Sequence, residues 1–184
     1  MFQRISTKEA FEQVYPILAE AFPVTELRTK EKQMALLKKE AYRLFAVLDD
    51  QKEVCGVIAA WELADDFLYM EHFAILPQKR NGGFGGKVLD CFTDWYRKPI
   101  VLEVEVPNDD LTRRRVGFYQ RHGFIYHEYP YLQPPMREGQ DFVPLRLMTK
   151  PNPIDQATYE RCRCLIYREV YQYYADDACR IHKK

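Results

Sequence analysis

The stretch QKRNGGFGGK, residues 78–87, places four glycines within five positions. The apolar run FLYMEHFAIL before it is typical of a buried strand, and the residues after it repeat apolar side chains at helical spacing. A glycine-rich turn from a strand into a helix lets backbone N–H groups point into one small space, where the helix start adds partial positive charge. The stretch therefore predicts a phosphate-binding site, with a flexible surface turn as the simpler alternative.

Two common phosphate-binding motifs do not fit this loop. The dinucleotide-binding fingerprint requires a third glycine where Val88 stands. A P-loop requires glycine at Asn81 and serine or threonine after Lys87. The sequence therefore disfavours both a dinucleotide-binding fold and a P-loop nucleotide phosphatase.

Length and composition favour one folded domain. The 184 residues are 47% apolar, and 27 acidic residues balance 27 basic ones. The N-terminus lacks a long apolar segment, and no run approaches the roughly 20 apolar residues that cross a bilayer. We therefore expect a cytoplasmic protein without a nucleic-acid or membrane partner.

The five cysteines are odd in number and irregular in spacing, which does not indicate a disulfide framework. Cys162 and Cys164 are separated by one residue and have no second pair, a poor spacing for zinc. We therefore expect no metal site.

The apolar patterns predict an α/β protein. Helices are expected at residues 6–22, 29–40, 85–95, 111–123 and 155–174. Strands are expected as a hairpin at 42–63 and at 67–76, 99–106, 124–132 and 142–148. In the second helix, Met34 and Leu37 should face inward. We expect one domain at 1–150 and a helical extension at 151–184 that packs on this domain or forms a homodimer contact.

The glycine loop also carries a family resemblance. Arg80-Asn81-Gly82-Gly83-Phe84-Gly85 resembles the Arg/Gln-x-x-Gly-x-Gly/Ala signature of the GCN5-related N-acetyltransferase (GNAT) superfamily. FYQRHGF, residues 118–124, resembles the family's later helix-to-strand segment, in which a tyrosine stands four residues before Gly-Phe. An asparagine that family members often carry seven or eight residues before this tyrosine is replaced by Thr112, and Asn108 lies eleven residues before it.

The resemblance covers residues 3–150 and implies the GNAT acyl-CoA N-acyltransferase fold, a mixed, mostly antiparallel sheet flanked by helices, here with an extra C-terminal helix. It implies transfer of the acetyl group of acetyl-coenzyme A (acetyl-CoA) to the primary amine of a small molecule or peptide, without a metal. The backbone of Phe73, Ala74 and Ile75 would meet the pantetheine and acetyl group. The phosphates would be held by Arg80, Asn81, Gly82, Gly83, Phe84, Gly85 and Gly86. The alternative is a regulatory module of the same fold that binds acetyl-CoA or a nucleotide without turnover.

Glu71 and Tyr119 are the candidate catalytic residues. Glu71 stands four residues before Ile75, where relatives place a catalytic His or Glu, and an acid within an apolar run is costly without a reason. Tyr119 matches the family tyrosine, and a phenol with a pKa near 10 carries a proton that a thiolate could accept. The simpler alternatives are a salt bridge at an exposed strand position for Glu71 and packing for Tyr119.

Glu103 and Glu105 alternate with apolar residues, so their carboxylates share one face of a strand. They are tentative acceptor-binding residues that could attract a cationic amine or relay its proton, and a solvated strand face is the alternative. His72 has the opposite parity to Glu71 and is expected to point away from the same site. The loop YLQPPMREGQ, residues 131–140, is expected to influence the choice of amine.

Overall fold

The computed structural model describes residues 1–63 and 67–174. The chain forms two compact units, which we describe separately. The first consists of Met1–Glu62 and Met70–Lys98, and the second of Leu63–Tyr69 and Pro99–Lys184.

The strands of the first unit follow the order β1-β2-β3-β4. Their bounds are β1 (Phe2–Arg4), β2 (Tyr42–Leu48), β3 (Val54–Leu63) and β4 (Phe67–Ile75), of which β4 begins in the second unit. β2 and β3 pair antiparallel, with Tyr42 opposite Trp61, so the predicted hairpin is confirmed. The strand β1, which pairs with β2, was not predicted, because three residues carry too little periodicity to recognise.

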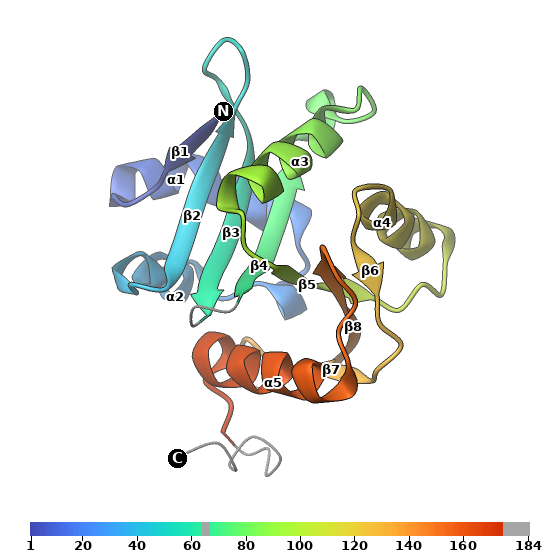
Figure 1. Cartoon of the computed structure of the whole chain (residues 1–184). Coiled ribbons are helices and arrows are strands. Elements are labelled where there is room, and N and C mark those ends of the chain that lie inside the picture. The colour runs from blue at the N-terminus through green and yellow to red at the C-terminus, as the bar shows by residue number, and fades with distance from the viewer. Residues whose placement is uncertain (64–66, 175–184) are drawn as a thin grey trace. The chain divides into compact units, whose positions relative to one another are not determined.

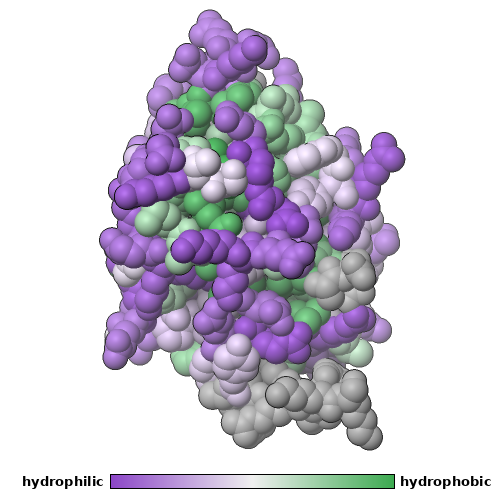
Figure 2. All heavy atoms as spheres, turned by 90° about the vertical axis from the view of Figure 1, so that its left-hand side faces the viewer, coloured by the Kyte–Doolittle hydropathy of each residue, from purple (hydrophilic) through white to green (hydrophobic). Residues whose placement is uncertain are grey.

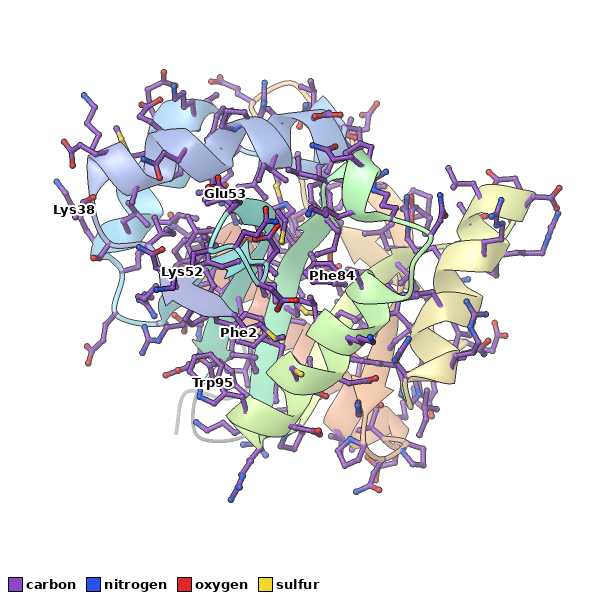
Figure 3. All side chains as sticks on the ribbon, turned by 90° about the horizontal axis from the view of Figure 1, so that it is seen from above. Phe2, Lys38, Lys52, Glu53, Phe84 and Trp95 are labelled. Carbon is purple, nitrogen blue, oxygen red and sulfur yellow. The ribbon has the colours of Figure 1, made fainter. Side chains whose placement is uncertain are left out.

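The helices of the first unit are α1 (Lys8–Ala21), α2 (Lys30–Ala35) and α3 (Phe84–Tyr96). α1 and α3 lie on opposite faces of the strands β2 and β3 (Figures 1 and 3). The predicted start of α1 is confirmed, because the Thr7 side chain accepts a hydrogen bond from the Ala10 backbone N–H at 3.3 Å. In the view of Figure 3, Phe84 and Trp95 lie toward opposite ends of α3, and the Trp95 indole stacks on the Phe2 ring with centroids 5.6 Å apart.

The second helix is shorter than predicted and buries a different face. α2 ends at Ala35 and continues as the 3₁₀ turn Leu36–Lys38. Gln33 and Leu36 are buried, whereas Met34 and Leu37 are half-buried, so the predicted inward face was wrong by one position. Gln33 can be buried because its side-chain N–H donates a hydrogen bond to the Tyr42 hydroxyl at 2.8 Å.

The second unit is built around β8 (Val143–Lys150). β5 (Ile100–Glu105), β6 (Ile125–Tyr126) and β7 (Tyr131–Gln133) all pair antiparallel with β8. The single strand predicted at 124–132 is therefore two short strands. α4 (Asp110–Arg121) begins at a capping box between Asp109 and Thr112 and is followed by Gly123 at φ +82°, which confirms the predicted helix end.

The C-terminal helix α5 (Gln156–Ile166) belongs to the second unit and continues as one π-helical stretch, Tyr167–Tyr171. Its buried face comprises Tyr159, Cys162, Ile166, Tyr167 and Val170. The Tyr159 hydroxyl donates to the Pro130 carbonyl at 2.8 Å, which ties α5 to the segment between β6 and β7. Cys164 takes part in a disulfide that the cysteine spacing did not indicate. The predicted extension continues past residue 174, outside the described residues.

Among the described residues, no helix combines the length and the apolar character needed to span a bilayer. On the face shown in Figure 2, hydrophilic side chains predominate and apolar side chains show between them. That pattern is ordinary for a surface in contact with water.

Gly56 on β3 allows a close approach to the end of β4, and its replacement tests this packing. A Cβ at this position would lie 2.6 Å from the Ala74 carbonyl oxygen and 2.7 Å from Ile75 Cδ1. We expect Gly56→Ala to lower the free energy of unfolding by about 1–3 kcal/mol, because the strand backbone must shift. Gly82→Ala is the control, since a Cβ there meets nothing within 4 Å. Equal melting of the two variants in denaturant would contradict the packing argument.

Candidate functional site

The glycine loop lies between β4 and α3, as the sequence predicted. Residues 77–83 are exposed, and the backbone enters the left-handed region at Asn81 (φ +67°) and Gly83 (φ +74°). A Cβ added at Gly82 or Gly83 would meet nothing within 4 Å, so space stays open over this backbone. The loop therefore has the bare, exposed main chain that a phosphate group needs for close approach.

The start of α3 leaves backbone donors available to a ligand. Gly83 is the N-cap and supplies no side-chain bond, and the first turn contains no acidic residue. The first bond of the helix runs from the Lys87 N–H to the Gly83 carbonyl at 3.1 Å, so the N–H groups of Phe84, Gly85 and Gly86 have no partner within the helix. These donors and the positive end of the helix dipole favour an anion.

The end of β4 is tied to the loop and to β3. The Arg80 Nε–H donates to the Ile75 carbonyl at 2.7 Å, and the Leu76 N–H donates to the Cys55 carbonyl at 2.9 Å. These bonds fix the direction in which the chain leaves β4. The predicted backbone contacts, Phe73 to Ile75, therefore lead directly into the loop on the same unit.

Glu71 lies on β4 with its carboxylate enclosed. Its side chain is only 1% exposed, and its Oε1 accepts from Arg28 Nη1 at 2.5 Å. Its Oε2 accepts from the Trp61 Nε1–H at 3.0 Å. Burial raises the pKa of Glu71, but the charge of Arg28 and the bond from Trp61 outweigh it, so the pKa is lowered. The carboxylate is therefore ionised at neutral pH and is a weak proton acceptor in this arrangement.

His72 follows Glu71 on β4, and its Nδ1 lies 3.7 Å from Glu71 Oε2. The His72 Nε2 lies 2.9 Å from the Glu26 carbonyl oxygen, which can only accept, so Nε2 carries the proton. Burial lowers the pKa of His72 and keeps the ring neutral. The buried Nδ1 has no hydrogen-bond partner and presents a lone pair toward the carboxylate.

Tyr119 is half-buried on α4 in the second unit, and its ring packs on Phe118 and Phe124. Burial raises the pKa of its hydroxyl to about 12, with Arg115 and Glu105 as opposing charges nearby. The phenol therefore keeps its proton at neutral pH, as a general acid for a thiolate would have to.

The carboxylates of Glu103 and Glu105 lie on the same face of β5 but have different partners. Glu105 forms an ion pair with Arg115. Glu103 accepts hydrogen bonds from the hydroxyls of Tyr131 and of Tyr171, the latter at 2.8 Å. Sequence reasoning missed both tyrosines as partners, because they stand 28 and 68 residues from Glu103.

The described residues were also considered as a source of a metal site or a ligand cavity. No three His, Cys, Asp or Glu side chains among them gather as a metal site would require. A cavity of about 240 Å³ in the second unit lies beside the first turns of α5, and it is lined mainly by apolar residues such as Phe67, Ile100 and Ile154. None of the predicted site residues lines this cavity.

The enclosure of Glu71 predicts a large stability effect. Glu71→Gln leaves the Arg28 charge buried without its partner, which should lower the free energy of unfolding by about 3–5 kcal/mol. The pKa of Glu71 is lower in the folded than in the unfolded chain. Its contribution to the free energy of unfolding is therefore present above the unfolded pKa of about 4.3 and is lost as the pH falls through the folded pKa. As the pH is lowered, the free energy of unfolding measured by denaturant melts should therefore fall less in the variant than in the wild type.

Glu62→Gln is the matched control for this measurement. Glu62 pairs with Arg43 at 2.9 Å, with side chains 30% and 22% exposed, and such a pair contributes about 1 kcal/mol or less. If Glu71→Gln lost no more free energy of unfolding than Glu62→Gln, the ion pair of Arg28 and Glu71 would not stabilise the first unit as argued.

This chain is similar in sequence and in fold to known acetyltransferases. A sequence model of the acetyltransferase (GNAT) family matches residues 11–124. A solved GNAT-family structure from Bacteroides thetaiotaomicron is 37% identical, covers 95% of this chain and 99% of its own, and superposes with a TM-score of 0.89.

More distant relatives share part of the chain or the fold. YjbC of Bacillus subtilis is 34% identical over 112 residues, which are 60% of this chain and 55% of YjbC, so the match spans about half of that relative. A spermidine N-acetyltransferase from Vibrio cholerae, solved with CoA and spermine, is 16% identical over 86% of this chain and 96% of its own, with a TM-score of 0.61. That likeness shows the fold alone. With its glycine loop, its family match and a mixed, mostly antiparallel sheet flanked by helices, the chain belongs to the GNAT acetyltransferase family.

Proposed function

We propose that this protein transfers the acetyl group of acetyl-CoA to a primary amine. The observation that carries the proposal is the exposed glycine loop that opens α3, with left-handed backbone at Asn81 and Gly83 and no side-chain cap. Family membership supports the same reaction. A small-molecule or peptide amine is the proposed acceptor.

The loop fits the pyrophosphate of coenzyme A on physical grounds. Pyrophosphate needs several donors that converge, a positive potential and room for its oxygens. The N–H groups at the start of α3 supply donors, the helix dipole supplies the potential, and the missing side chains at Gly82 and Gly83 leave the room. Main-chain groups of Phe73, Ala74 and Ile75 would hold the pantetheine arm.

In the proposed reaction, the neutral amine nitrogen attacks the thioester carbonyl carbon, and the carbon–sulfur bond breaks. The amine gives up one proton, and the departing thiolate takes one. We assign the second proton to Tyr119, whose raised pKa keeps its hydroxyl protonated until a thiolate forms. The products are the N-acetylated amine and free coenzyme A.

Glu71 is the proposed base, under a condition that its contacts impose. Arg28 holds Oε1 and Trp61 holds Oε2, and the lowered pKa makes the carboxylate a poor acceptor of a proton. It can act as a base only if Arg28 withdraws when the acceptor binds. Otherwise the proton passes to Glu103, to Glu105 or to ordered water. Partial recovery of the activity of Glu71→Gln at high pH would support the role of base.

The direct test is a panel of primary amines assayed for release of free thiol from acetyl-CoA. Amine-dependent thiol release with a matching N-acetylated product supports the proposal. Binding of acetyl-CoA without thiol release from any amine would instead support a regulatory module of the same fold.

The phosphate assignment predicts a separation of stability from binding at Gly85. A Cβ there would lie 3.6 Å from Ile75 Cγ1, which is an ordinary contact, and alanine in a helix is favoured over glycine by about 1 kcal/mol. Gly85→Ala should therefore melt no lower than the wild type. Its Cβ should nevertheless crowd the phosphate and weaken coenzyme A binding, measured by calorimetry, by about tenfold or more.

Gly117→Ala on α4 is the control for this experiment, because it makes the same change within a helix outside the loop. It should keep the affinity of the wild type. Unchanged affinity in Gly85→Ala would overturn the assignment of the loop to phosphate.

The role of Tyr119 predicts a kinetic effect without a binding effect. Tyr119→Phe keeps the ring packing on Phe118 and Phe124 and removes only the hydroxyl. We expect turnover to fall by about 10²-fold, which is typical for a lost general acid, with no change in coenzyme A affinity. Higher pH should not restore it. Tyr129→Phe, the same change elsewhere in the second unit, should keep normal turnover, and equal rates in the two variants would remove Tyr119 from the mechanism.

A further inference from the structure

The second unit contains the cavity of about 240 Å³ beside the first turns of α5, which has no role in the proposed acetyl transfer. The floor of the cavity is buried and consists of residues from β4, β5, β8 and α5, namely Phe67, Ile100, Val101, Thr149 and Cys162. The rim is exposed and includes Pro99, Asn152 and Thr158. A buried floor below an exposed rim allows a small molecule to enter from solvent.

Hydrogen bonds hold the walls of this cavity in place. The Leu68 N–H donates to the Pro99 carbonyl at 2.8 Å, which joins the start of β4 to the segment before β5. The Thr149 hydroxyl donates to the Asn152 carbonyl at 2.8 Å. Because its single proton is used there, the 2.8 Å contact between Thr149 and His127 is a bond that the His127 Nε2–H donates. The cavity is therefore preformed, and the hydroxyl in its floor already has a donor and an acceptor.

The polar groups around the cavity do not indicate a charged ligand. The Asp155 side chain accepts from the Thr158 N–H at 2.8 Å and caps α5, so the start of this helix is already bound to a carboxylate. The Lys150 ammonium lies 5.8 Å from the centroid of the Phe124 ring, which does not line the cavity. In the described part of the chain, no buried polar side-chain atom that lacks a hydrogen bond belongs to a lining residue. Since an ordered water needs several polar partners, the cavity favours an apolar occupant.

The volume of the cavity indicates the size of this occupant. An apolar cavity of about 150 Å³ in another protein holds benzene. On the same scale, the cavity of about 240 Å³ holds a molecule of about eight to ten non-hydrogen atoms. An aromatic ring with a short alkyl chain has this size, and transfer of its apolar surface from water into the cavity is favourable.

We propose that this cavity is a binding site for a neutral, apolar molecule of the alkylbenzene class. The site is independent of the proposed acetyl transfer, because neither the glycine loop nor any candidate catalytic residue lines it. Most of its lining residues lie between Thr149 and Cys162, beyond residue 124, where the match to the family model ends. Family membership therefore does not predict the site.

The first test compares probes of similar size that differ in charge. Binding of ethylbenzene, benzylammonium and benzoate is measured by calorimetry at neutral pH. Ethylbenzene should bind at one site with a Kd of about 1 mM or tighter. Each charged probe should bind at least about tenfold more weakly, because its charge would lose hydration without gaining a partner. A charged probe that bound as tightly as ethylbenzene would overturn the ligand class, and no binding of ethylbenzene would overturn the site.

Opposite substitutions at Ile154, a half-buried residue that lines the cavity, test where the ligand binds. Ile154→Phe should fill part of the cavity and weaken ethylbenzene binding by about tenfold or more. Ile154→Ala should widen the cavity and raise the affinity for butylbenzene relative to ethylbenzene by about tenfold, or about fourfold for each added methylene. A ratio of affinities within one variant does not depend on the stability of that variant.

Leu111→Phe is the control for these variants, because Leu111 is exposed on α4 in the same unit and does not line the cavity. It should keep the affinities of the wild type. Thr158→Phe, at the exposed rim, replaces Ile154→Phe if that variant does not fold. Ligand preferences that stayed the same in the narrowed and the widened cavity would overturn the inference, whether or not the protein transfers acetyl groups.

Discussion

Burial of the Glu71 carboxylate is the constraint on which the first unit depends. A buried charge is tolerated only when a partner charge and hydrogen bonds compensate its lost hydration, and here Arg28 and Trp61 do so. Arg28 lies between the 3₁₀ turn after α1 and the start of α2, so the ion pair fastens this connection to β4. His72, bonded to the Glu26 carbonyl, fastens the same connection at a second point.

Enclosure of the Glu71 side chain affects the end of β4, whose backbone is proposed to contact coenzyme A. The Glu71 residue is partly exposed although its side chain is enclosed, so the exposure lies on its main chain. A strand that is held through its side chains can offer its backbone to a ligand without losing its position. The Arg80 side chain donates a hydrogen bond to the Ile75 carbonyl, which also holds the start of the glycine loop against the end of β4.

The sequence predicted those features that depend on neighbours in the chain. The glycine loop, the Thr7 cap and the hairpin of β2 and β3 each follow from a few consecutive residues. Features that depend on distant partners were missed. Gln33 is buried because of Tyr42, Glu71 is enclosed because of Arg28, 43 residues away, and Glu103 is held by Tyr171, 68 residues away. Local periodicity carries no record of such pairs.

The two carboxylates show why residue type alone does not assign a role. Glu71 faces a guanidinium in a buried site, so its charge is largely spent on holding the fold, and removal of either partner would leave an isolated charge. Glu103 accepts hydrogen bonds from two phenol hydroxyls, which orient its carboxylate. The hydrogen-bond donors around each carboxylate, more than its position on a strand, therefore determine the chemistry that is open to it.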